Sequence, residues 1–310
     1  MKSLETRENT AIMQLNNPMD LLYKFSLYVD AKPRTVESYI GNIKRFLEYL
    51  KENNISKPTR EDIIAYRDYL KANYKATTTQ SYIIAIRQFF KWLEQEGIYS
   101  NVADNIKGAR ISKEHKKDAL TSNQVTGVLK GIDRSTEQGK RDYAMLALMV
   151  TGGLRDIEVT RANIGDIRPL ADQIVLYIQG KGKDDKEDYI KLVDEVQEAI
   201  KDYLKTRDDI DEGAPLFTSI SNNSKGQRLT TRSVSGTVKK YLKKSGLNSS
   251  RLTAHSLRHT AVTLTLLNGG TLQEAQEFAR HTSITTTQIY AHNLNRLNNK
   301  SEDRIASSIF

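Results

Sequence analysis

Six side chains from residue 155 onward in this 310-residue chain have the types needed for chemistry on a phosphate group. Arginine and lysine bind phosphate oxygens, and histidine moves protons near neutral pH. A tyrosine hydroxyl can attack phosphorus once its proton is removed. A site of this kind gathers cations around one phosphate, with the hydroxyl nucleophile beside it. The six candidates are Arg155, Lys181, His255, Arg258, His281 and Tyr290.

The local spacing of the first four candidates favours such a site, although each also has a simpler interpretation. Arg155 follows Thr-Gly-Gly-Leu, and Glu158 three residues later would hold its guanidinium, as in many surface ion pairs. Lys181 lies in a Gly-Lys-Gly-Lys turn, where a lysine usually faces solvent. His255 and Arg258 share one face at the start of a predicted helix, a pattern that a core histidine beside a surface arginine also produces.

The remaining candidates lie near the end of the sequence. His281 and Tyr290 are nine residues apart across the Thr- and Ser-rich segment Thr282–Thr287, and His259 lies upstream in the sequence His-Ser-Leu-Arg-His. Taken alone, Tyr290 would be a packing tyrosine whose hydroxyl is satisfied by a neighbour. The case for a reactive tyrosine therefore depends on the set of candidates and not on any single one.

The composition excludes several other kinds of site. The chain contains no cysteine, which excludes disulfides, thiolate zinc sites, iron–sulfur clusters and a cysteine nucleophile. No cluster of acidic residues and histidines indicates a two-metal nuclease, and neither a Walker loop nor an HExxH motif occurs. We therefore expect no metal and no cofactor.

The charge distribution suggests a nucleic-acid partner. The formal net charge is +9, and the stretch between Glu212 and Glu274 contains nine lysines and arginines but no acidic residue. Such a stretch attracts a polyanion, although a solvated helix face followed by a basic loop is the alternative explanation. The longest apolar run, Tyr143–Leu154, is too short to span a bilayer, and the polar N-terminus lacks a signal-peptide core. We expect a soluble, cytoplasmic protein associated with the nucleoid and not with a membrane.

Apolar spacing predicts a small all-α domain over residues 19–106. Helices are expected over 35–50, 59–70 and 78–96, with apolar residues recurring at intervals of three and four. Thr59 and Asp62 match a capping box, and Gly97 would end the third helix. Residues 1–18 are predicted to form a flexible arm, and the basic, aperiodic segment 107–117 an interdomain linker.

Residues 118–310 are predicted to form an α-rich domain with a small antiparallel sheet. The β-branched runs 173–179 and 189–193 flank a polar, glycine-containing turn, which is typical of a hairpin. Helices are expected over 120–132, 143–150, 194–206, 232–244, 256–267, 272–279 and around 285–292.

Taken in order, these motifs resemble those of the tyrosine recombinase (phage integrase) family. The family pattern is T-G-x-R-x-x-E, a G-K-G turn between strands, H-x-L-R-H, and a G-H whose histidine precedes the nucleophilic tyrosine by nine residues. This chain reads TGGLRDIEV, QGKGKDD, HSLRH and ARHTSITTTQIY, and TTTQSYIIAIRQFFKWL is similar to the family's core-binding domain. The resemblance implies a mainly α fold, with an N-terminal helical core-binding (SAM-like) domain and an α-rich catalytic domain carrying a small antiparallel β-sheet.

Two places depart from the family pattern. Arg280 stands where the family has a glycine before the last histidine of the site. The return strand of the hairpin, which usually carries an arginine and then a proline, reads KEDYIK. Because acidic residues lie so close to this turn, Lys183 and Lys186 remain rivals of Lys181 for the family's lysine position.

The resemblance implies a site-specific recombinase that breaks and rejoins DNA without metal or ATP. Tyr290 would attack a phosphodiester, forming a 3′-phosphotyrosyl link and freeing a 5′-hydroxyl. The 5′-hydroxyl of another strand would then attack this link and rejoin the DNA. The other implied roles are general base for His255, phosphate binding for Arg155, Arg258 and His281, general acid for Lys181, and support for Glu158 and His259.

The resemblance also implies the partners. Four copies of the chain would act on two DNA duplexes with inverted-repeat core sites, passing through a Holliday junction, with an accessory directionality or host factor as a further partner. The segment after Tyr290 would dock on a neighbouring copy. DNA contacts are expected from side chains that a solvated helix face would also explain, namely Thr77, Thr78, Gln80, Arg87, Lys91, Lys44, Lys239 and Lys240.

Two other functions stay open on the sequence alone. A type IB topoisomerase would use the same chemistry as a monomer, without a paired site. A DNA-binding regulator with a decayed site would form no covalent product, although the presence of all six candidate residues argues against decay. Among recombinases, a chromosome-dimer resolvase of the Xer type and a transposon or phage integrase both fit these motifs.

Overall fold

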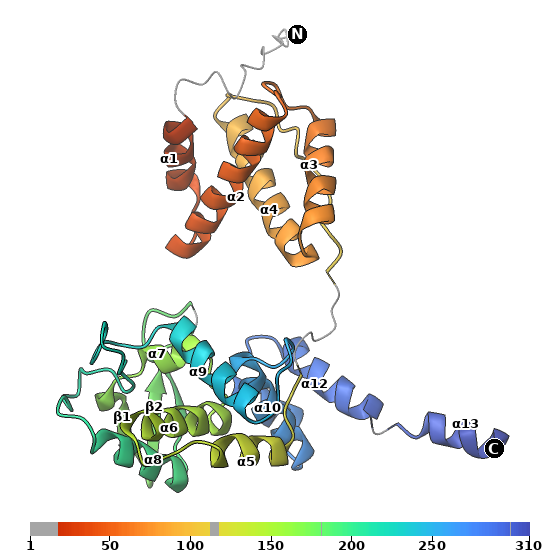
Figure 1. The fold of residues 1–310 in the computed structure, drawn as a ribbon. Helices are drawn as coiled ribbons and strands as arrows, with labels where there is room; N and C mark the ends of the chain where they lie inside the picture. Colours follow the sequence, from red (N-terminus) through yellow and green to blue (C-terminus); the bar gives the residue numbers. More distant parts are fainter. Residues whose placement is uncertain (1–17, 112–117, 181, 298) are drawn as a thin grey trace. The chain divides into compact units, whose positions relative to one another are not determined.

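The chain forms two compact units, residues 1–113 and 114–310. The structure, a computed structural model, describes residues 18–111, 118–180, 182–297 and 299–310 (Figure 1). Residues 1–17 of the expected arm 1–18 and residues 112–117 of the expected linker 107–117 therefore lie outside the described residues. Within the described ranges, no helix combines the length and the apolar character needed to cross a membrane.

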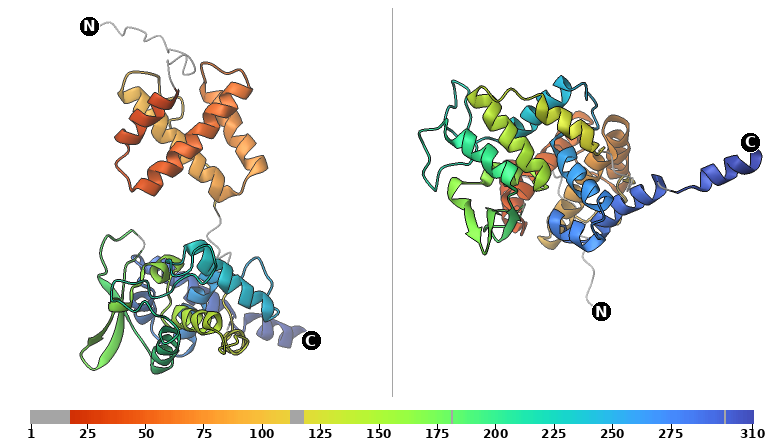
Figure 2. Two further views of the ribbon diagram at one scale, coloured as in Figure 1. Left: turned by 60° about the vertical axis from the view of Figure 1, so that its left-hand side comes forward. Right: turned by 90° about the horizontal axis from the view of Figure 1, so that it is seen from below.

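The first unit is a bundle of four helices. It consists of α1 (Pro18–Tyr28), α2 (Pro33–Glu52), α3 (Arg60–Asn73) and α4 (Ala76–Gln95). The long helix α4 packs against the other three (Figure 2). It supplies the buried Phe89, Phe90 and Trp92 to an aromatic core. At the start of α3, the Thr59 side chain accepts a hydrogen bond from the Asp62 N–H, and the Asp62 carboxylate accepts one from the Thr59 N–H. The predicted capping box is thus confirmed.

Three helices of this unit were predicted and the fourth, α1, was not. Its buried residues Leu21, Leu22 and Phe25 face the core, but Met19, Tyr23 and Leu27 on its other side are exposed. Because both faces are apolar, the segment lacks the contrast between faces that reveals an amphipathic helix. Contacts with α2 and α4 bury the inner face of this helix and stabilise it.

The second unit is mainly helical, as predicted, with a small sheet at one side (Figure 1). Helix α6 is buried along most of its length and packs against α8 and α10, so it forms the centre of the main core. The helices are α5 (Ser122–Lys130), α6 (Glu137–Thr151), α7 (Asp156–Arg161), α8 (Asp194–Leu204), α9 (Thr231–Lys244), α10 (Ala254–Leu267), α11 (Leu272–Ala279), α12 (Ile284–Leu297) and α13 (Ser301–Ile309).

The sheet has the strand order β1-β2-β3, with both neighbouring pairs antiparallel. Strands β2 (Gln173–Ile178) and β3 (Asp188–Lys191) form the predicted hairpin. Strand β1 (Ile167–Leu170) was not predicted. Three of its four residues are exposed and one of them is Pro169, so it has neither the alternation nor the composition of a typical strand. It lies at the edge of the sheet, where a proline is tolerated.

A smaller apolar cluster holds three neighbouring helices of the second unit together. Helices α10, α11 and α12 contact one another pairwise. Val262, Ala275, Ala279 and Tyr290 form the buried centre of this cluster, and Phe278 packs against it. Small residues let the helices approach closely, so Tyr290 is positioned by the same packing that joins α12 to α10 and α11.

Candidate active site

Most of the candidate residues come together from four separate segments of the second unit. Arg155 is the residue before α7, His255 and Arg258 lie in the first turns of α10, and Tyr290 lies in α12. His281 follows α11 and is partly buried. Contacts among α10, α11 and α12, together with hydrogen bonds to the Thr151–Arg155 loop, join these segments.

Arg155 is held by a buried carboxylate, as its spacing predicted. Its Nη1 donates to Glu158 Oε1 at 2.7 Å and its backbone N–H to Oε2 at 2.8 Å. Glu158 is fully buried, whereas the Arg155 side chain is 27% exposed. Burial alone would raise the Glu158 pKa, but the positive charges of Arg280 and Arg155 and the hydrogen bonds from Arg155 lower it below its ordinary value. The carboxylate is therefore ionised and holds the Arg155 guanidinium, which stays partly exposed.

Arg258 is almost completely buried beneath the site, with 1% of its surface exposed. Its Nη1 donates to the Gly153 carbonyl at 2.6 Å and its Nη2 to the Ala279 carbonyl. Burial, together with the neighbouring Arg155 and Arg280, lowers its pKa, yet a guanidinium remains charged at neutral pH. Arg258 thus joins the loop before α7 to the end of α11 and brings a fixed positive charge to the site.

Arg280, noted only as a departure from the family pattern, has a larger part in the structure than its position suggested. It ends α11 in the left-handed region, with φ 52° and ψ 46°. Its guanidinium donates to Glu158 Oε2 at 3.0 Å and to the carbonyl groups of Gly152, Gly153 and Phe278. The side chain is 10% exposed, so Arg280 belongs to the interior of the site and not to its rim.

His281 is kept neutral by its surroundings. Burial, and then the charges of Arg258, Arg155 and Arg280, lower its pKa to about 4. Its Nδ1 lies 2.9 Å from the hydroxyl of Thr287, which is fully buried. The ring also stacks on Tyr290, with 6.2 Å between ring centroids.

Tyr290 is buried, with 6% of its surface exposed, and its hydroxyl is hydrogen-bonded to His259 Nδ1. Burial raises the pKa of Tyr290 to about 12, against the opposing charges of Arg258 and Arg155. His255, which we expected to be the base, is exposed and packs edge-on against His259, with 4.5 Å between ring centroids. The structure thus places His259 at the hydroxyl and His255 one ring farther away.

The hairpin lysines differ in their environments. Lys183 Nζ lies 3.1 Å from Asp188 and 3.3 Å from Glu187, and these hydrogen bonds raise its pKa. Lys186 pairs with Asp166. Lys181, the candidate at the family position, lies outside the described residues.

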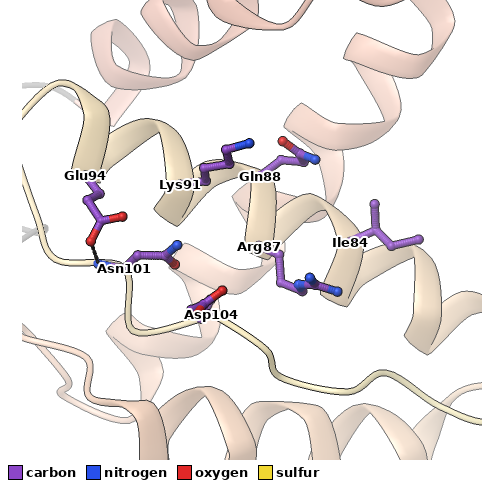
Figure 3. A pocket seen from close by; sticks show the side chains of 8 residues that line it. Ile84, Arg87, Gln88, Lys91, Glu94, Asn101 and Asp104 are labelled. Atoms are coloured by element: carbon purple, nitrogen blue, oxygen red, sulfur yellow. Dashed lines mark hydrogen bonds between the residues drawn. The ribbon is translucent and has the colours of Figure 1, made fainter.

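The candidate DNA-contact residues are spread over both units. In the first unit, Arg87 and Lys91 are exposed on α4 and line a cavity of about 620 Å³ between α4 and the segment that holds Asn101 and Asp104 (Figure 3). The other candidates in this unit are the exposed Lys44 and Thr77 and the half-buried Thr78 and Gln80.

In the second unit, Lys239 and Lys240 lie on α9 but differ in exposure. Lys239 donates to the carbonyl groups of Ser249 and Leu252, whereas the Lys240 side chain is 52% exposed and lies 3.8 Å from Asp142. Part of the basic stretch is therefore used within the fold. Across the described ranges, no group of three or more acidic or histidine side chains is placed to hold a metal ion.

Two members of the site were missed or underrated from sequence. Thr287 gave no signal beyond lying in a Thr-rich segment, and Arg280 was treated as a neighbouring charge. The sequence carried one signal for Arg280. This residue follows the end of an amphipathic helix, where the backbone commonly turns left-handed and glycine is the usual residue, so an arginine there is unusual.

Two family models match the chain. The model described as "Phage integrase family" matches residues 118–296, and "Phage integrase, N-terminal SAM-like domain" matches residues 23–97. The chain is 33% identical over 268 residues to the tyrosine recombinase XerC of Herpetosiphon aurantiacus, covering 83% of this chain and 84% of that protein. It is 34% identical over 197 residues to the XerC of Chlamydia caviae, covering 63% and 60% of the two chains.

Solved structures show the same fold. The XerH site-specific recombinase bound to a palindromic difH substrate superposes with a TM-score of 0.72 at 21% identity, covering 96% of this chain and 86% of that one. A lambda integrase tetramer bound to a Holliday junction gives a TM-score of 0.68 at 19% identity, covering 93% and 80%. Since the integrase model spans more than half of the chain and a recombinase is 33% identical over 83% of it, this chain belongs to the phage integrase family of tyrosine recombinases and is an enzyme of site-specific recombination.

Proposed function

We propose that the chain cuts and rejoins double-stranded DNA at a specific site through a 3′-phosphotyrosyl intermediate on Tyr290. The observation that carries this proposal is the surroundings of the Tyr290 hydroxyl. It is hydrogen-bonded to His259, stacked beside His281, and lies in the electrostatic field of Arg258 and Arg155. A nucleophile, a proton acceptor and fixed cations are the parts that transfer of a phosphodiester to a hydroxyl requires.

Activation of Tyr290 begins from a protonated phenol, because its pKa is about 12. His259 Nδ1 accepts the proton as the hydroxyl attacks phosphorus, since it is the ring nitrogen in contact with that hydroxyl. His255, edge-on to His259, would stabilise the charge or take up the proton. This assignment extends the role expected for His255 by placing His259 between it and the nucleophile.

The phosphate is held by charges whose positions are set before it binds. Glu158 orients Arg155, and two backbone carbonyls orient Arg258, so little reorganisation is needed when charge develops on the phosphoryl oxygens. For His281, we assign the Thr287 hydroxyl as the donor to Nδ1 across their 2.9 Å contact, and a neutral ring then carries its proton on Nε2. That tautomer lets His281 donate a hydrogen bond to the phosphate at neutral pH.

Lys181 is the proposed general acid for the 5′-oxygen leaving group. The two rival lysines are engaged by carboxylates, Lys183 by Asp188 and Glu187 and Lys186 by Asp166. A lysine that serves as an acid near neutral pH needs a lowered pKa, and a carboxylate partner has the opposite effect. The pairing of its rivals therefore favours Lys181.

The proposed substrate is a pair of DNA duplexes held by four copies of the chain, with an inverted-repeat core site and a Holliday-junction intermediate. The lambda integrase neighbour is a tetramer on such a junction, and the XerH neighbour is bound to a palindromic site. Every residue of α13 is exposed, including Ile305 and Ile309, and so is Phe310 directly after it, which supports docking of this helix on a neighbouring copy. DNA contacts would come from Lys44, Arg87, Lys91 and Lys240, together with Thr77, Thr78 and Gln80, whereas Lys239 is held by the Ser249 and Leu252 carbonyls.

Covalent trapping tests the proposed function. The purified chain is incubated with nicked, sheared host DNA, and adducts that survive detergent are digested and sequenced. We expect adducts on Tyr290 that share an inverted-repeat site, none with Tyr290→Phe, and normal amounts with Tyr189→Phe, an exposed hairpin control. Adducts spread over all sequences would indicate a topoisomerase. Tight DNA binding with no adduct would refute the proposed chemistry.

A further inference from the structure

The backbone at Arg280 is in a conformation that arginine disfavours. Four described residues other than glycine have a positive φ, and two of them, Asn54 and Asn105, are asparagines, which tolerate this region. Arg280 adopts it at the end of α11, where glycine is the usual choice. The side chain must therefore contribute something that offsets the unfavourable backbone.

The Arg280 side chain links Glu158, which holds Arg155, to the Gly153 carbonyl, which holds Arg258. Its Nη2 lies 3.0 Å from Glu158 Oε2, the oxygen that also accepts from the Arg155 N–H. The same Nη2 lies 3.1 Å from the Gly153 carbonyl, which also accepts from Arg258 Nη1. Arg280 thus shares one acceptor with Arg155 and another with Arg258.

The loop that carries the shared carbonyl depends on close packing at the same point. Gly153 has φ +57°, and a Cβ there would lie 2.9 Å from the Phe278 ring. Arg280 also donates to the Phe278 carbonyl at 2.9 Å and to the Gly152 carbonyl at 3.3 Å. One guanidinium therefore ties the Thr151–Arg155 loop to the end of α11.

The charges around Glu158 also indicate that Arg280 affects how Arg155 is held. Glu158 is the single carboxylate in contact with Arg155 and Arg280 among the described ion pairs. With Arg280 present, this carboxylate is shared, and Arg155 keeps donors for a ligand. Without Arg280, Glu158 Oε2 keeps only the backbone N–H of Arg155 as a donor. A second guanidinium N–H of Arg155 can then pair with Oε2, which gives a bidentate pair turned away from the phosphate.

We propose that Arg280 is a positioning residue for the reaction, which holds Glu158 and the Gly153 carbonyl so that Arg155 and Arg258 present their guanidinium groups to the scissile phosphate. The inference rests on the proposed function, because it assigns both arginines to that phosphate. Arg280 itself acts through these neighbours.

The test compares three variants in a single-turnover cleavage assay with protein in excess over a nicked DNA site. Arg280→Gly and Arg280→Asn suit the left-handed backbone but lack the guanidinium, whereas Arg280→Lys keeps a positive donor. We expect cleavage to slow roughly 10- to 100-fold in the first two variants, as on loss of a preorganising contact, with DNA affinity within about twofold of wild type. The Lys variant should recover part of the rate.

A double-mutant cycle with Glu158→Gln separates positioning from a general loss of structure. If Arg280 acts partly through Glu158, Arg280→Gly should slow cleavage by a smaller factor in the Glu158→Gln background than in wild type, because only the contact with the Gly153 carbonyl is then left to lose. Additive losses, a wild-type rate in Arg280→Gly, or a rate loss matched by an equal loss of DNA affinity would overturn the proposal. The midpoint of thermal unfolding provides the structural control. Arg280→Gly relaxes the backbone but loses the hydrogen bonds of the guanidinium, so the cleavage rates are compared at a temperature well below the lowest midpoint.

A second measurement keeps this inference separate from the proposed function. Side-chain Nε–H signals of Arg155 and Arg258, assigned by nuclear magnetic resonance with Arg155→Lys and Arg258→Lys variants, report how firmly each guanidinium is held. In Arg280→Gly we expect both signals to shift and the Arg258 signal to exchange faster with water. Unchanged signals would overturn the positioning role. If the wild-type chain forms no adduct, the proposed function fails, and these signals still decide whether Arg280 positions the two arginines.

Discussion

The neutral state of His281 predicts a specific loss of stability in mild acid. In the folded chain its pKa is about 4, because of burial and three neighbouring arginines, against 6.5 for a free histidine. Between these values the unfolded chain binds a proton that the folded chain does not. Stability therefore rises with pH across this window and falls as the pH is lowered from 6.5 toward 4.

The size of the effect follows from the two pKa values. At pH 5 the ring is mostly protonated in the unfolded chain and mostly neutral in the folded one, which corresponds to about 2 kcal/mol of lost stability relative to pH 7.5. Because the ring is only partly buried, solvent screening reduces this to about 1–2 kcal/mol. The variant His281→Asn has no titratable side chain at this position, so it should not lose this stability of about 1–2 kcal/mol.

Urea unfolding of both proteins at pH 7.5, 6.5, 5.5 and 5 measures the difference. Circular dichroism follows both units, whereas fluorescence of Trp92, the single tryptophan, follows the first unit. The fluorescence transition should depend on pH equally in wild type and variant, which provides an internal control. If the stability of the second unit falls in parallel in both proteins, His281 is not kept neutral, and the proposed tautomer loses its basis.

Three further predictions concern other parts of the chain. Thr287→Val removes the hydroxyl at His281 Nδ1 and should slow single-turnover cleavage roughly tenfold without changing DNA affinity; an unchanged rate would contradict the tautomer assignment. Lys44→Ala should reduce the slope of log affinity against log salt by about 0.9. Lys239→Ala loses two carbonyl contacts within the fold, so it should leave that slope unchanged and lower stability by about 1 kcal/mol. Thr59→Ala removes the cap of α3 and should lower the stability of the first unit by about 1 kcal/mol, read from Trp92 fluorescence; equal stability would show that the cap contributes nothing.

Local pattern was sufficient for much of the fold. The periodic helices of both units and the β2–β3 hairpin lie close to their predicted positions, and the Thr59–Asp62 box caps α3 as expected. These elements were accessible because side-chain spacing and caps act over a few residues. Helix α1 and strand β1 were not accessible, since their character comes from neighbours that are distant in sequence.

The sequence by itself determined the family, the two-part organisation of motifs and the identity of the candidate nucleophile, because residue types at given spacings specify what chemistry is available. Only the tertiary structure decided which partners these residues have. It placed His259 rather than His255 against Tyr290, and it brought Arg280 to Glu158, 122 residues away in sequence. Hydrogen bonds and electrostatic fields depend on separations of a few ångströms in space, and the packing of α10, α11 and α12 sets those separations.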